Sequence, residues 1–128
     1  MNYYTEKIIQ ADFDTAIERV QESLKEQGFG VLSEIKINEK LDEKLGIDFR
    51  KYTILGACNP PLAHKALQAE DKIGTLLPCN VIVQDVGDGK VEVAAIDPVA
   101  SMHVVENDRL MDIAKEVKVK LDLAITNL

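Results

Sequence analysis

Two cysteine-containing segments carry the most unusual local chemistry of this sequence. They read Cys58-Asn59-Pro60-Pro61 and Leu77-Pro78-Cys79-Asn80. A thiol can act as a nucleophile, a redox group or a soft metal ligand, and an asparagine beside it adds an amide donor and acceptor. The two segments predict a site only if the chain brings them to the same place.

The two histidines of the chain, His64 and His103, widen the choice of chemistry. His64 follows Cys58 closely, and His103 follows Asp97 closely. Two thiolates and two imidazoles, from Cys58, Cys79, His64 and His103, would satisfy a tetrahedral transition metal. The spacing is poor for zinc, because the sequence has no C-x-x-C pair. Cysteines that only pack and imidazoles at helix edges are the structural alternative.

The elements that must position these residues follow from hydrophobic periodicity and from helix caps. We expect five strands, over residues 3–9, 31–37, 52–58, 79–86 and 90–97, the second of them half-buried. We expect helices after Asp12, Asn38, Asn59 and Asn107 or Asp108, with the third spanning residues 60–72 and the last ending near Leu128. The order indicates an α+β fold in which helices cover one face of an antiparallel sheet.

The register of the hairpin formed by the last two strands decides which polar groups meet. With Gly87-Asp88-Gly89 as the loop, Val83 pairs with Val93 and Val81 with Ala95. Continuing this register places Cys79 opposite Asp97, whereas a shift of one residue places Asn80 there. Either register gathers polar groups at the open end of the hairpin.

The connection after Cys58 decides whether this residue joins them. A parallel fourth strand would place the two cysteines at opposite ends of the sheet. A helix of about 13 residues descends roughly 20 Å, and residues 73–78, if extended, climb nearly as far back. An antiparallel arrangement is therefore within reach, and it brings Cys58, Cys79 and Asp97 to one end. Cys58, Asn59, Cys79, Asn80 and Asp97 form the predicted ligand-binding cluster, and a bridge between the cysteines stays open.

Composition limits the classes of function. The 128 residues suit a single domain spanning 1–128. The net charge of −7, with locally balanced lysines, disfavours nucleic acid as a partner. We expect no membrane association, and the two cysteines and the polar N-terminus favour a cytoplasmic protein. No motif implies a cofactor, which leaves its identity unknown, and no motif of a known enzyme class is present.

The stretch from Gly56 to Ala63, the stretch from Leu76 to Val81, and Asp97-Pro98 together resemble the domain-of-unknown-function family 302 (DUF302). The resemblance extends over nearly the whole chain. It implies a fold like that of TATA-binding protein, β-α-β(4)-α, with an additional helix between strands three and four, and a homodimer. It implies no settled reaction and no DNA binding.

Three interpretations of function follow. The first is a domain that binds a small-molecule ligand or a metal at the polar cluster. The second is a thiol-dependent enzyme or redox protein that uses Cys58 or Cys79, although no catalytic residue can be assigned. The third is a homodimeric interaction module without a catalytic site.

Overall fold

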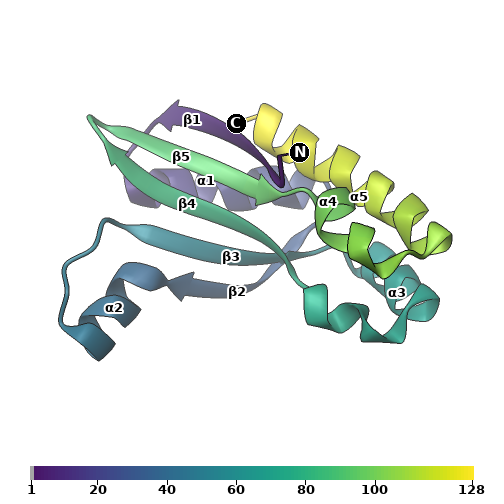
Figure 1. The fold of residues 1–128 in the computed structure, drawn as a ribbon. Helices are drawn as coiled ribbons and strands as arrows, with labels where there is room; N and C mark the ends of the chain where they lie inside the picture. The colour runs from purple at the N-terminus through teal and green to yellow at the C-terminus, as the bar shows by residue number, and fades with distance from the viewer. Residues whose placement is uncertain (1) are drawn as a thin grey trace.

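The computed structural model describes residues 2–128, which form one five-stranded antiparallel sheet with helices packed against it (Figure 1). The strands are β1 (Tyr4–Gln10), β2 (Gly30–Lys36), β3 (Tyr52–Cys58), β4 (Cys79–Gly87) and β5 (Lys90–Ile96), in the order β1-β5-β4-β3-β2. The helices are α1 (Phe13–Glu26), α2 (Ile37–Leu45), α3 (Pro60–Ala69), α4 (Pro98–Met102) and α5 (Asp108–Thr126), with 3₁₀ turns η1 (Asp71–Leu76) and η2 (His103–Val105). The predicted α+β class is confirmed.

The core lies between one face of the sheet and the helices α1, α3 and α5. Alternate residues of the central strands point into it, among them Leu55, Val81 and Val93, which are fully buried. Helix α5 contributes a stripe of buried apolar residues, including Leu110 and Leu121. The core is aliphatic, as the low aromatic content of 5% indicates.

The hairpin register is confirmed. Val83 pairs with Val93 and Val81 with Ala95, and β3 pairs antiparallel with β4. The return to β4, however, differs from the prediction. Helix α3 ends at Ala69, before residue 72, and residues 71–76 form a 3₁₀ turn instead of an extended segment. The chain therefore returns to the end of the sheet, where β4 begins, through the short helical turn η1.

The second strand and the helix after it also differ from the prediction. β2 is an edge strand whose side chains are mostly exposed, because only β3 pairs with it and a bulge between Val31 and Ser33 interrupts the alternation. Leu32 at this bulge is 71% exposed. Helix α2 begins at Ile37 rather than after a cap at Asn38, since the Asn38 side chain instead accepts a hydrogen bond from the Tyr52 N–H, at 3.2 Å.

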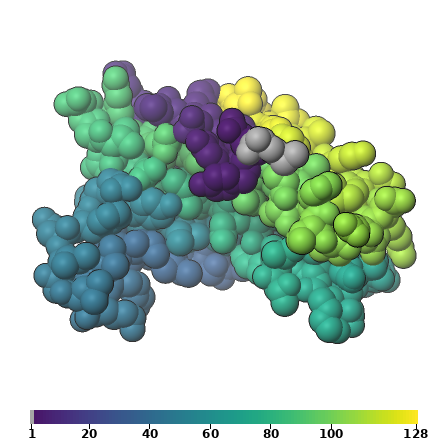
Figure 2. All heavy atoms as spheres, viewed as in Figure 1, coloured from purple at the N-terminus to yellow at the C-terminus, as the bar shows by residue number. Residues whose placement is uncertain are grey.

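The space-filling view shows the segment that contains α2 standing out from the rest of the surface (Figure 2). This agrees with the burial, because no residue of α2 is buried. Over residues 2–128, none of the helices combines the length and the apolar character needed to cross a bilayer.

Candidate functional site

The candidate site lies at the end of the sheet where β3 stops and β4 starts. Cys58 is the last residue of β3 and Cys79 the first of β4, and Cys79 pairs with Ala57. β5 runs parallel to β3, so Asp97, which follows β5, lies at the same end of the sheet. The predicted convergence on one end of the sheet is therefore correct for these three residues.

A close contact between two strands holds the first residues of β4 in place. A Cβ on Gly56 would lie 2.8 Å from Cγ of Pro78 and would also meet Oγ of Ser33. The absence of a side chain at Gly56 therefore leaves room for the Pro78 ring beside the β3 backbone, immediately before Cys79. The close approach explains why β3, otherwise rich in bulky residues, carries a glycine near its end.

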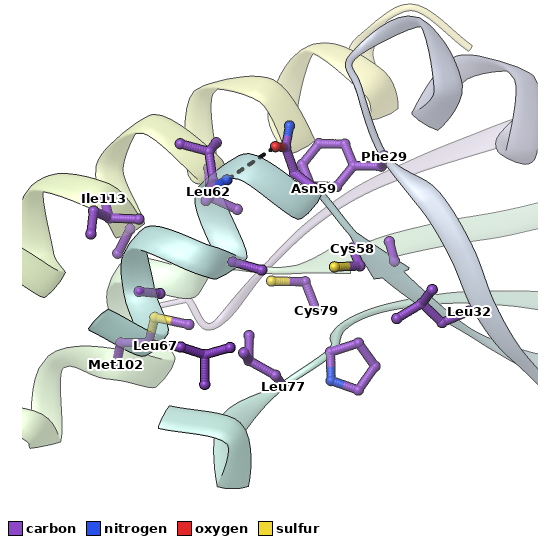
Figure 3. Close-up of a pocket in the computed structure, with 16 residues that line it drawn as sticks. Phe29, Leu32, Cys58, Asn59, Leu62, Leu67, Leu77, Cys79, Met102 and Ile113 are labelled. Carbon is purple, nitrogen blue, oxygen red and sulfur yellow. Dashed lines mark hydrogen bonds between the residues drawn. The ribbon is translucent and has the colours of Figure 1, made fainter. Parts of the chain in front are cut away.

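A pocket of about 300 Å³ opens between this end of the sheet and helices α3, α4 and α5 (Figure 3). Its walls are almost entirely apolar. They consist of Phe29, Leu32, Ala57, Cys58, Asn59, Leu62, Ala63, Ala66, Leu67, Leu77, Pro78, Cys79, Met102, Ile113, Ala114 and Val117. Leu32 and Leu67 are exposed, at 71% and 43%, so apolar surface continues from the pocket to its rim.

Both cysteines line this pocket as free thiols, and Figure 3 shows their sulfur atoms directed into it. Cys79 is buried, with 7% of its surface exposed, whereas Cys58 is half-buried. Burial, and secondly the nearby Cys58, raise the pKa of the Cys79 thiol from 9.0 to about 11. Cys79 is thus a protonated thiol at neutral pH, which weakens its case as a nucleophile.

Asn59 also lines the pocket, but its polar atoms are engaged elsewhere. Its Oδ1 accepts a hydrogen bond from the Leu62 N–H at 3.4 Å, which caps α3 as predicted. Its Nδ2 donates to the carbonyl of Gln27 at 3.5 Å, which joins the start of α3 to the end of α1. Asn59 therefore positions two helices around the pocket and has little capacity left for a ligand.

Asn80 and Asp97 do not reach the pocket. Asn80 follows Cys79 on β4 and so faces the opposite side of the sheet, where it is exposed and borders a hollow that contains Gln84. The Asp97 carboxylate caps α4, accepting hydrogen bonds from the N–H groups of Val99 at 2.9 Å and Ala100 at 3.3 Å. Its other oxygen lies 3.7 Å from Nζ of Lys118. The five-residue polar cluster is therefore split between two faces and a helix cap.

The histidines are also separate from the thiols. His64 is exposed on α3 and His103 is exposed in η2, and neither lines the pocket. Within residues 2–128, no three or more His, Cys, Asp or Glu side chains form a group that could hold a metal ion. The structure therefore offers no support for the four-ligand site predicted from Cys58, His64, Cys79 and His103.

Comparison with known proteins agrees with this fold. The model of a family described as a domain of unknown function, DUF302, matches residues 4–128. The chain belongs to DUF302. It is similar to the crystal structure of an uncharacterised conserved DUF302 protein from Bacillus stearothermophilus, with 30% identity, 98% of each chain covered and a TM-score of 0.90. No curated protein matches the chain. The resemblance to DUF302 is thus confirmed, while that to TATA-binding protein stays a prediction.

Most of the pocket of this DUF302 protein was not identified from sequence. The residues that were missed are apolar, such as Phe29 before β2, Met102 at the end of α4, and Ile113 and Val117 on α5. In a sequence they have the same signature as core residues. A partial signal was present in α3, where Ala63 and Ala66 place small side chains beside the cysteine segment and leave space next to it.

Proposed function

We propose that this DUF302 domain binds a small apolar molecule in the pocket beside Cys58 and Cys79. The observation that carries the proposal is the lining itself. Among the described residues around the pocket, Asn59 alone has an oxygen or nitrogen in its side chain, and both its polar groups already have partners. A polar ligand would lose hydrogen bonds to water without replacing them, at a cost of about 1–3 kcal/mol for each group.

The size of the pocket sets the size of the ligand. An engineered apolar cavity of about 150 Å³ holds a benzene molecule, and this pocket has about twice that volume, at about 300 Å³. A fused two-ring hydrocarbon or a short alkyl chain would therefore fit. The volume is at the lower limit of known ligand pockets, roughly 300 to 1,000 Å³.

The chemistry of the walls also fits an apolar ligand. The thiols and the Met102 thioether are soft, polarisable groups that make favourable contacts with aromatic rings. Within residues 2–128, no buried side-chain oxygen or nitrogen lacks a hydrogen-bond partner. An apolar guest would therefore leave no buried polar side-chain atom waiting for a partner that it could not supply.

Titration with naphthalene tests the proposal, with binding followed by chemical-shift changes of the Ala and Met methyl groups. We expect saturable binding that shifts the Ala66, Met102 and Ala114 methyls, which line the pocket, and leaves the methyl of Ala16 in α1 unchanged. Native mass spectrometry of protein purified without detergent would show whether a natural ligand is retained. Absence of saturable shifts at the pocket methyls would refute the proposal.

A further inference from the structure

We propose that Cys58 and Cys79 form a dithiol that exchanges with small disulfides carrying apolar substituents, Cys58 reacting first and Cys79 second. The preference for apolar substituents rests on the proposed binding function. The pairing of the two thiols rests on separate observations of their geometry.

The positions of the two residues on adjacent strands suit a disulfide bond. Cys79 pairs with Ala57, so Cys58 is its diagonal neighbour. With strands about 4.8 Å apart and a rise of about 3.4 Å per residue, the two Cα atoms lie about 6 Å apart, inside the roughly 4.4–6.8 Å that disulfides span. Successive strand residues point to opposite faces, but Cys58 ends its strand, and its side chain lines the same pocket as Cys79 (Figure 3).

The two thiols differ in access, and this difference sets the order of reaction. Cys58 is half-buried whereas Cys79 is 7% exposed, so an incoming disulfide meets Cys58 first. Burial and then the proximity of Cys58 keep the pKa of Cys79 high. Once Cys58 is part of a mixed disulfide it bears no charge, so it no longer raises the pKa of Cys79.

The reaction balances without a further oxidant. The thiolate of Cys58 attacks one sulfur of RS–SR, the S–S bond breaks, and RS⁻ leaves and takes up the proton that Cys58 released. The product is a mixed disulfide at Cys58 whose substituent R lies in the apolar pocket. Cys79 then releases its proton and attacks Sγ of Cys58, displacing the second RS⁻, which becomes RSH. The protein loses two electrons and two hydrogens, and RS–SR becomes two RSH.

Dipropyl disulfide and bis(2-hydroxyethyl) disulfide are matched probes, equal in length and different in polarity. Intact-protein mass spectrometry follows the products, and the rate ratio of the two reagents with the denatured chain corrects for their intrinsic reactivity. For the folded protein we expect a corrected preference of about tenfold for the dipropyl reagent, since a methyl group replaces a hydroxyl in an apolar pocket. The wild-type product should lack two hydrogens and carry no substituent.

Single variants test the order of reaction. Cys79→Ser and Cys79→Ala should both stop at the mixed disulfide on Cys58. Because the two substitutions perturb the buried position differently, the same product from both would show that the missing thiol, and not misfolding, stops the reaction. Cys58→Ser should react at least about tenfold more slowly than wild type, because the remaining thiol is buried and protonated. Equal rates for Cys58→Ser and Cys79→Ser would overturn the order.

Naphthalene binding in the same samples distinguishes failure of this inference from failure of the proposed function. If naphthalene binds but wild type accumulates two mixed disulfides and no internal bond, the dithiol inference falls and the binding function stands. If the internal disulfide forms without naphthalene binding and without preference between the reagents, the binding function falls, and with it the apolar substrate class.

Discussion

Replacing Ala66 by a larger residue gives the sharpest test of whether the pocket is open and can hold additional atoms. Ala66 lies on α3, is 3% exposed and lines the pocket. Ala66→Leu adds three carbon atoms at about 0.8 kcal/mol of transfer free energy each, or about 2 kcal/mol. Leucine is nearly as good a helix former as alanine. We expect the free energy of unfolding to rise by about 1–2 kcal/mol, because the pocket of about 300 Å³ holds the added atoms without strain.

Ala16 supplies the matched control. It lies on α1, is 0% exposed, belongs to the same core and does not line the pocket. The same substitution at this closed position should destabilise the protein by about 1–3 kcal/mol, because a densely packed interior has no room for it. The two variants are thus expected to shift the stability in opposite directions.

Urea unfolding measures both shifts, with an unchanged slope showing that the comparison is valid. At about 4 °C per kcal/mol for a chain of this size, thermal melting should separate the two variants by roughly 8 to 20 °C. Naphthalene titration of Ala66→Leu should show an affinity at least about tenfold below that of wild type, since the leucine occupies the ligand volume. Equal destabilisation of both variants would refute the existence of the open pocket.

Four further predictions follow from contacts, pKa values and the family resemblance. Gly56→Ala should destabilise the protein by about 1–3 kcal/mol, because its Cβ meets a proline ring, while Gly30→Ala, which meets nothing within 4 Å, should stay within about 0.5 kcal/mol in the same urea assay. Backbone and side-chain hydrogen bonds from Thr15 lower the pKa of Asp12 below 3.8, so the stability that this cap provides is present above pH 3.8 and is lost as the pH falls further. Asp12→Asn keeps a capping side chain without the titrating carboxylate. Acid unfolding of this variant, followed by circular dichroism, should therefore depend less on pH than that of wild type. Because the pKa of Cys79 is raised on folding, its protonated thiol contributes fully to the free energy of unfolding below pH 9.0, and this contribution is lost as the pH rises towards about 11. In urea unfolding, Cys79→Ala should therefore lose less stability at alkaline pH than wild type does. The expected homodimer is checked by sedimentation equilibrium, where a monomer at high concentration would contradict it.

Much of the fold could be predicted because local patterns and long-range pairing agree. Residues 52–58 match β3 completely, and the predicted pairing of Val83 with Val93 is correct. The loop is shorter than predicted, because Gly87 ends β4 opposite Lys90 and a bulge between Asp85 and Gly87 makes up the difference. The errors occur where tertiary context decides. Val31, Ser33 and Ile35 alternate like the inner face of a half-buried strand, yet β2 is an edge strand with a bulge, and Ser33 and Ile35 are exposed. Sequence periodicity contains no information about which strand lies at an edge.

The candidate site divides in a similar way. The antiparallel arrangement of β3 and β4 places Cys58 and Cys79 at one end of the sheet, as expected. The chain returns, however, through a 3₁₀ turn and not through the extended segment on which that expectation rested. The sides on which Asn80 and Asp97 project were not predicted. A neighbouring residue on a strand faces the opposite side, so Asn80 leaves the pocket as a direct consequence of Cys79 entering it. The apolar lining could not be predicted, since pocket and core residues have the same composition.

The fate of the polar residues explains why the pocket is apolar. Asn59 and Asp97 each follow a strand, each precede a proline, and each cap the helix that starts there. The same use of a side-chain oxygen recurs at Asp12 for α1 and at Asn107 for α5. Unpaired N–H groups at the start of a helix must be satisfied, and at this end of the sheet α3 and α4 each start directly after a strand. The side chains that looked most suited to a polar ligand are therefore occupied by the backbone, and what remains to meet a guest is hydrocarbon and sulfur.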